Sequence, residues 1–139
     1  MREFKSYEEM NRIHQEEYNA LPIVYMFGRK TDEEIAEALK PIKANSIHEC
    51  VSLFGAGDVM RKNDVPAILE CMRKHTEEKK LFQNNNLVSC ILTEMYSCEY
   101  SYACEKEDVL NALGRTYADF EDETFRKAWQ IAEAKYLGE

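Results

Sequence analysis

The sequence predicts an α+β fold, a mostly helical single domain over residues 1–139 with a small antiparallel β-sheet. Two patterns favour this class. Apolar residues recur every three to four positions along much of the chain, and short β-branched or aromatic runs stand between turn residues. A length of 139 residues fits one domain, because two would leave neither half enough residues for a comfortable core. Six Phe and eight Tyr supply bulk for that core.

The first half of the chain predicts two helices and three strands. Ser6 and Glu9 form a capping pair that begins a helix, and Pro22 ends it because proline has no backbone N–H to donate. Thr31 and Glu34 begin a second, short helix in the same way. Strands are predicted over residues 22–27, 48–54 and 58–62, with a tight turn at 55–57.

The second half predicts three helices after a long one. Asn63 or Asp64 caps a helix that carries one apolar stripe and runs to about Phe82, and three asparagines at 84–86 interrupt it. Residues 87–96 are apolar nearly all round, which predicts a helix at the centre of the fold. Further predictions are an extended segment at a sheet edge over 99–102, a short helix over 107–113 and an amphipathic helix over 122–137.

Charge argues against two classes of partner. The net charge is −8, and the sequence pI is about 5.0. An acidic chain is repelled by nucleic-acid phosphates and by anionic lipid, so we expect neither direct nucleic-acid binding nor membrane association. The start of the chain has charges every few residues and no apolar run, which is unlike a signal peptide or a membrane anchor.

The cysteines predict a reducing compartment. Their number is odd, no two have the Cys-x-x-Cys spacing, and no export signal is visible, so we expect reduced thiols in a cytoplasm. Cys90 lies within a hydrophobic run, where a thiol serves as a small apolar filler. The five are Cys50, Cys71, Cys90, Cys98 and Cys104.

A glycine-rich turn followed by two cations is the candidate anion or ligand site. Gly55 and Gly57 could expose backbone amides, and Arg61 and Lys62 could add positive charge. The segment has neither the order of a P-loop nor that of a dinucleotide fingerprint. A hairpin turn with a solvated basic strand end explains the same residues.

The candidate metal ligands are Cys71, His75 and Glu78. Positions i, i+4 and i+7 share one helix face, so a thiolate, an imidazole and a carboxylate could converge on zinc. His14 and Glu17 repeat the His-x-x-Glu spacing on another predicted helix. The structural alternative is that Cys71 and His75 border the apolar stripe and that Glu78 is solvated. No cofactor is expected, and no nucleophile motif points to a catalytic residue.

Three tyrosines form the candidate interaction surface. Tyr96, Tyr100 and Tyr102 could stack on bases, but the glutamates around them would repel a phosphate backbone. Tyrosine also suits protein interfaces, because it offers apolar area with a polar tip.

Five short motifs stand in order along the chain. They are Ser52 to Gly57, Met60 to Asp64, Arg73-Lys74-His75, Glu99 to Tyr102, and Asp108 to Gly114 with Thr116. Together they resemble an uncharacterised domain-of-unknown-function family of small proteins encoded by bacteriophages and gut bacteria. Cys98 is a departure, because the family often has a His before the Glu-Tyr pair.

The resemblance implies no activity, cofactor or catalytic residue. It implies a phage or mobile-element origin and action inside a bacterial host cell. Together with the acidic charge, this predicts a small non-enzymatic binding or inhibitor protein that docks on a host or phage protein, such as a defence or nucleic-acid enzyme. The alternative is an anion-binding module or weak enzyme that uses the Gly55–Gly57 turn with Arg61 and Lys62. A third hypothesis is a metalloprotein that uses Cys71, His75 and Glu78. A homodimer is compatible with all three.

Overall fold

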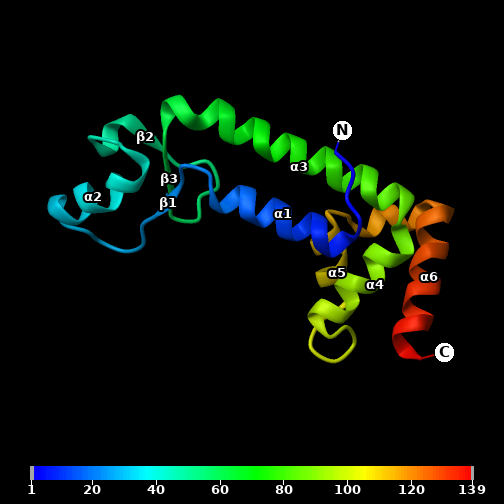
Figure 1. The fold of residues 1–139 in the computed structure, drawn as a ribbon. Coiled ribbons are helices and arrows are strands. Elements are labelled where there is room, and N and C mark those ends of the chain that lie inside the picture. Colours follow the sequence, from blue (N-terminus) through cyan, green and yellow to red (C-terminus); the bar gives the residue numbers. More distant parts are fainter. Residues whose placement is uncertain (1, 139) are drawn as a thin grey trace. The chain divides into compact units, whose positions relative to one another are not determined.

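The computed structural model describes residues 2–138 and confirms the predicted class (Figure 1). Within these residues it has six α-helices and a three-stranded antiparallel sheet. The helices are α1 (Tyr7–Asn19), α2 (Asp32–Leu39), α3 (Val65–Asn85), α4 (Leu87–Cys98), α5 (Lys106–Leu113) and α6 (Glu123–Leu137). The strands are β1 (Val24–Tyr25), β2 (Cys50–Val51) and β3 (Asp58–Arg61).

The chain divides into two compact units. Unit 1 consists of Met1–Asn11 and Glu77–Glu139, and unit 2 of Arg12–Thr76. Helices α1 and α3 each contribute residues to both units. The organisation of the chain as one domain stays a prediction. Among residues 2–138, no helix combines the length and the apolar character that crossing a bilayer requires.

Unit 1 is built around α4, as the all-round apolar pattern predicted. Cys90, Ile91 and Met95 of this helix have no exposed surface, and Cys90 is the apolar filler expected. Burial, and then the charge of Glu94, raise the pKa of the Cys90 thiol to about 12. The remaining buried apolar residues of this core are Tyr7, Met10, Tyr100, Val109, Leu110, Leu113, Phe125, Ala128, Trp129 and Ala132.

Unit 2 contains the sheet. Strand β3 lies in the middle and pairs antiparallel with β1 on one side and with β2 on the other. Met60 of β3 and Ile68 of α3 are fully buried, and Leu39 of α2 is 1% exposed. The capping box predicted for α2 is present in both directions. The Thr31 hydroxyl accepts the Glu34 amide, and the Glu34 carboxylate accepts the Thr31 amide.

One predicted strand is shorter than expected, and one predicted extended segment is wrong. Residues Ile47–Glu49 form a 3₁₀ helix instead of the start of a strand, because the Ser46 hydroxyl accepts the His48 amide and caps a turn. After β2 the chain bends away towards the glycine turn, so only two residues of the predicted strand 48–54 pair. The predicted sheet-edge segment over 99–102 is part of a tight loop that follows α4.

Candidate functional site

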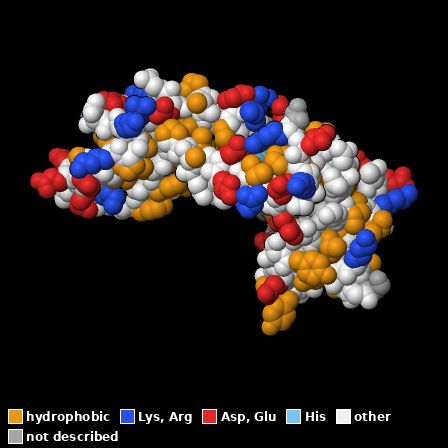
Figure 2. Space-filling model, in the orientation of Figure 1, with side chains coloured by type: hydrophobic (Ala, Val, Ile, Leu, Met, Phe, Trp, Pro, Cys, Tyr) orange, Lys and Arg blue, Asp and Glu red, His pale blue; other side chains and the backbone are white. Residues whose placement is uncertain are grey.

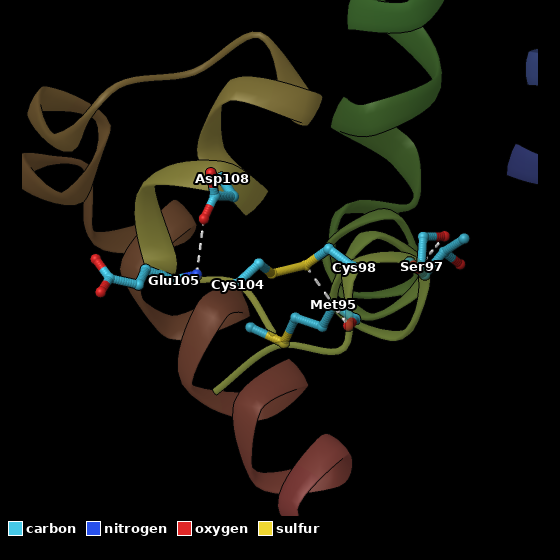
Figure 3. The surroundings of a disulfide bond; sticks show 7 residues. Met95, Ser97, Cys98, Cys104, Glu105 and Asp108 are labelled. Carbon is cyan, nitrogen blue, oxygen red and sulfur yellow. Dashed lines mark hydrogen bonds between the residues drawn. A yellow bond between two sulfur atoms is a disulfide. The ribbon is translucent and has the colours of Figure 1, made fainter. Parts of the chain in front are cut away.

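A disulfide bond closes the loop between α4 and α5. Cys98 is the last residue of α4, Cys104 precedes α5, and their Cα atoms are 5.8 Å apart (Figure 3). The expectation of reduced thiols is therefore wrong for this pair. A left-handed backbone at Glu99, which caps the end of α4, and at Ser101 turns the chain back on itself and brings the two cysteines together. We call residues 99–104 the tyrosine loop.

Backbone hydrogen bonds order the tyrosine loop from within. The Glu99 carbonyl accepts the amides of Tyr102 and Ala103 at 3.1 and 2.8 Å. The Ser101 amide donates to the Cys104 carbonyl at 2.9 Å. Together with the disulfide, these hydrogen bonds hold the backbone of the short loop in place.

Tyr100 anchors the start of the loop in the core of unit 1. Its side chain is only 8% exposed, and its hydroxyl donates to the Glu133 carboxylate at 2.7 Å. Its ring meets the Trp129 ring edge-on at 6.0 Å between centroids, and the Trp129 indole donates to the same carboxylate. Burial, then the hydrogen bond to Glu133, raises the pKa of Tyr100 well above its ordinary value.

Exposure separates the three tyrosines predicted as an interaction surface. Tyr102 is 92% exposed and Tyr96 is 61% exposed, whereas Tyr100 is buried and serves as the anchor. The Tyr96 ring packs edge-on against Tyr136, which in turn packs against Tyr100. Figure 2 shows hydrophobic side chains over the end of unit 1 that holds this loop, with acidic side chains beside them. The surface that a partner can reach therefore contains Tyr96 and Tyr102 but not Tyr100.

Charged side chains line the surface hollow beside the tyrosine loop. It is bounded by the loop itself and by Glu105, Lys106 and Asp108 at the start of α5. The Asp108 carboxylate accepts the Glu105 amide at 2.8 Å and so caps α5 (Figure 3). Unit 1 as a whole carries 16 acidic and nine basic residues. The sequence of unit 1 is therefore acidic on balance.

The glycine turn of unit 2 already holds an anion, which is a carboxylate of the chain itself. Asp58 is 1% exposed, and its oxygens accept three backbone amides and one hydroxyl. Burial by itself would raise the pKa of Asp58, but these hydrogen bonds lower it to about 2. The donors are the amides of Leu53, Phe54 and Ala56 and the hydroxyl of Ser52, at 2.8 to 3.1 Å.

Three of the four residues predicted as an anion site, Gly55, Gly57 and Arg61, have hydrogen-bond partners within the chain. The amides that lead into Gly55 and Gly57 face Asp58, so a phosphate would have to displace that carboxylate. Arg61 pairs with Asp64 through two hydrogen bonds, at 2.9 and 3.3 Å. Lys62 lies on the surface. The site stays a prediction, and the contacts favour the hairpin explanation.

Two of the three predicted metal ligands meet. The Cys71 thiol lies 3.7 Å from His75 Nε2, and the Glu17 carboxylate approaches the same nitrogen at 3.0 Å. The His14 and His75 rings stack with their centroids 4.0 Å apart. Glu78 instead binds Arg2 through both carboxylate oxygens, at 2.8 Å each. Among residues 2–138, no three His, Cys, Asp or Glu side chains are arranged to hold a metal ion.

Sequence reasoning missed the residues that build both loops. The sequence pattern predicts Asp58 only as a strand residue, although an acid directly after a glycine turn is a signal for a carboxylate that binds the turn's amides. Cys98 and Cys104 have five residues between them, a spacing that no motif distinguishes. Glu133 had no signal, since it lies in an amphipathic helix with many other charges.

Comparison with known proteins identifies a family and no function. No curated protein and no solved structure matches the chain. A family model does match, over residues 6–135, and so covers most of the chain, the tyrosine loop and the Asp58 turn included. The chain belongs to the family of unknown function DUF7659.

Proposed function

We propose that this protein is a non-enzymatic binding protein that contacts a partner protein through the tyrosine loop and the adjoining end of α4. Tyr102 of the loop is the central contact, and Tyr96 of α4 is a second. The observation that carries the proposal is the 92% exposure of Tyr102 on a loop closed by a disulfide bond. A large aromatic side chain left in water on an ordered backbone is costly for the free protein and useful on binding, because little conformational freedom is then lost.

Charge defines the chemistry of the partner. Glu99, Glu105 and Glu107 flank or follow the exposed tyrosines, and unit 1 has seven more acidic than basic residues. An acidic rim around an aromatic contact is complementary to an apolar pocket with Lys or Arg at its edge. Proteins that bind nucleic acid have such basic surfaces. We therefore propose a basic host or phage protein as the partner, such as a nucleic-acid or defence enzyme.

The proposed setting follows from the resemblance of the motifs. A phage or mobile-element origin would place the protein in the cytoplasm of a bacterial host, where a small acidic inhibitor meets nucleic-acid enzymes. A carboxylate-rich surface can occupy a basic channel that otherwise holds a phosphate backbone.

The experiment is affinity capture from host lysate followed by measurement of Kd with the purified partner. The bait is the full chain, compared with Tyr102→Ser, Tyr96→Ser and the control Leu69→Ser, an exposed apolar residue of α3 in unit 2. We expect Tyr102→Ser to weaken binding by about tenfold or more, as truncation of a central aromatic contact does, and the control to bind as the native chain does. High salt should weaken capture. Equal Kd values for all variants would exclude this surface.

A further inference from the structure

We infer that the Cys98–Cys104 bond is a redox switch that converts the tyrosine loop between an ordered form and a mobile form with weaker partner binding. The inference rests on the proposed function, because it assigns a regulation to the same surface. Four observations support it: where the two cysteines lie, what backbone the loop adopts, where the loop is anchored and which residue it exposes.

The two cysteines lie at the edge of the core of unit 1, not within it. Both are only partly buried, and they pack against a cluster whose fully buried side chains come from α1, α4, α5 and α6. Cleavage of the bond therefore removes no buried side chain from the core. The fold of unit 1 is expected to survive reduction, so the effect of reduction is local.

The loop adopts a backbone that its residues do not favour. Glu99 and Ser101 have φ values of +57° and +67°, in the left-handed region where a side chain is unfavourable. Neither position is a glycine. Covalent closure between Cys98 and Cys104 reduces the number of other conformations that the loop can reach. Without it, these two residues gain access to extended backbone, and the exposed hydrogen bonds around them open more often.

Besides the disulfide, the tyrosine loop has a second anchor, which lies at the start of the loop. Tyr100 is held by Glu133 and Trp129 at the start of the loop. After reduction this anchor remains, while residues 101–104 lose the covalent link from Cys104 to Cys98 and are held at their far end only by the connection to α5. Tyr102 lies in that part, so its position becomes variable. Binding then requires ordering of the loop, which weakens the affinity.

Reduction of the Cys98–Cys104 bond needs a dithiol, and its re-formation needs a disulfide that accepts the two electrons. In reduction, one thiolate of the dithiol attacks a sulfur of the Cys98–Cys104 bond and forms a mixed disulfide, and the second thiolate then displaces the protein sulfur. The products are two cysteine thiols and one cyclic disulfide, with two electrons and two protons passed from the dithiol. Disulfides in reducing compartments are usually transient and redox-sensing, which is the behaviour inferred here.

Amide hydrogen exchange of the full chain tests the switch without a partner. The oxidised protein is compared with protein reduced by dithiothreitol. We expect the Tyr102 and Ala103 amides, which donate to Glu99, to exchange about tenfold faster after reduction, with α4 and α6 unchanged. The double variant Cys98→Ser/Cys104→Ser should exchange like reduced protein in both conditions. Cys50→Ser, a control cysteine in unit 2, should respond as the native chain does.

The outcomes separate the switch from the proposed function. Equal exchange in the loop before and after reduction would overturn the switch, whatever the protein binds. Faster exchange throughout α4 and α6 would also overturn it, because the bond would then hold the whole unit. Faster loop exchange with the same partner Kd in both redox states would overturn the control of binding while the proposed surface stands. Failure of the proposed function itself would appear as unaltered binding by Tyr102→Ser in the oxidised protein.

Discussion

The Asp58 carboxylate accepts the backbone amide of Leu53 at 2.8 Å, five residues back along the chain, and so closes the turn between β2 and β3 from inside. Two more amides and the Ser52 hydroxyl donate to the same carboxylate. The turn is thus an anion-binding loop whose anion is part of the sequence. Its order depends on the negative charge of Asp58, and two predictions follow from this residue.

Asp58→Asn should destabilise unit 2 by about 2 to 3 kcal/mol. The NH2 group of asparagine would face groups that are themselves hydrogen-bond donors, so some of the present hydrogen bonds would be lost. The remaining hydrogen bonds would be weaker because the acceptor no longer carries a negative charge. Chemical denaturation followed by circular dichroism measures the change. Asp32→Asn, at the exposed first turn of α2, is the matched control and should cost less than about 1 kcal/mol. A loss no larger than that of the control would show that the turn does not need the Asp58 carboxylate.

Acid should remove this stabilisation in a defined pH window. The folded pKa of Asp58, about 2, lies below the ordinary value of 3.8, so the folded state favours the ionised form. The contribution is fully present above about pH 5 and is lost as the pH falls through 4 towards 2. The difference in unfolding free energy between the native chain and Asp58→Asn should therefore shrink over that window. A difference that stays constant down to pH 2 would contradict the lowered pKa.

Gly57→Ala should destabilise the same turn more than Gly55→Ala. Both glycines have positive φ, +80° and +70°, so alanine is strained at either position by about 1 kcal/mol. Only at Gly57 would the new Cβ also collide with neighbours, 2.6 Å from Cε1 of Phe27 and 2.8 Å from the Met26 carbonyl oxygen. We expect a total loss of about 2 to 3 kcal/mol there. Thermal unfolding of the two variants measures the loss of stability in each. Equal losses of stability for Gly57→Ala and Gly55→Ala would exclude the collision.

Local patterns predicted the helices well because their causes are local. The Thr31–Glu34 capping box and the apolar run of α4 depend on residues three or four positions apart, and both are confirmed. The two loops depend on contacts that such patterns do not contain. Nothing in the periodicity distinguishes Tyr100, which contacts Glu133 33 residues later, from Tyr102, which is exposed.

The same limit applies to the candidate sites. Spacing on one helix placed Cys71, His75 and Glu78 together, but Arg2 binds Glu78 and Glu17 binds His75 from α1. The spacing along the helix was predicted correctly, but it contains no information about Arg2 and Glu17, which come from other parts of the chain. The predicted strand at residues 99–102 failed for a related reason, since a left-handed residue without glycine leaves no signal in the sequence.

Tyr7→Phe should weaken unit 1 through loss of one buried hydrogen bond. The Tyr7 hydroxyl donates to the Glu94 carboxylate at 2.6 Å and joins α1 to α4, and the ring is almost fully buried. Burial, then this hydrogen bond, raises the pKa of Tyr7 above its ordinary value. Loss of a hydrogen bond to a charged acceptor costs about 1.5 to 3 kcal/mol. Denaturation followed by the fluorescence of Trp129 measures it, with exposed Tyr117→Phe as a control that should change stability by less than about 0.5 kcal/mol.

Gln83→Leu should loosen the connection between α3 and the end of α5. Gln83 is 3% exposed, donates to the Leu113 carbonyl at 2.9 Å and accepts from Arg115 at 3.1 Å. Leucine has a similar volume but cannot form hydrogen bonds, so the Leu113 carbonyl and the Arg115 guanidinium would lose the Gln83 amide as a partner. Leu113 is the last residue of α5, where a backbone carbonyl has no partner within the helix.

We therefore expect a loss of about 1 to 3 kcal/mol from the Gln83→Leu change, and faster amide exchange at the C-terminal turn of α5. Gln15→Leu, on the exposed side of α1 in unit 2, is the matched control and should leave both measurements nearly unchanged, since its hydrogen bond to Asn19 lies in water. If α5 exchanges at the native rate in Gln83→Leu, the end of that helix is held by the apolar contacts of Leu110 and Leu113 with the core, and not by the Gln83 amide.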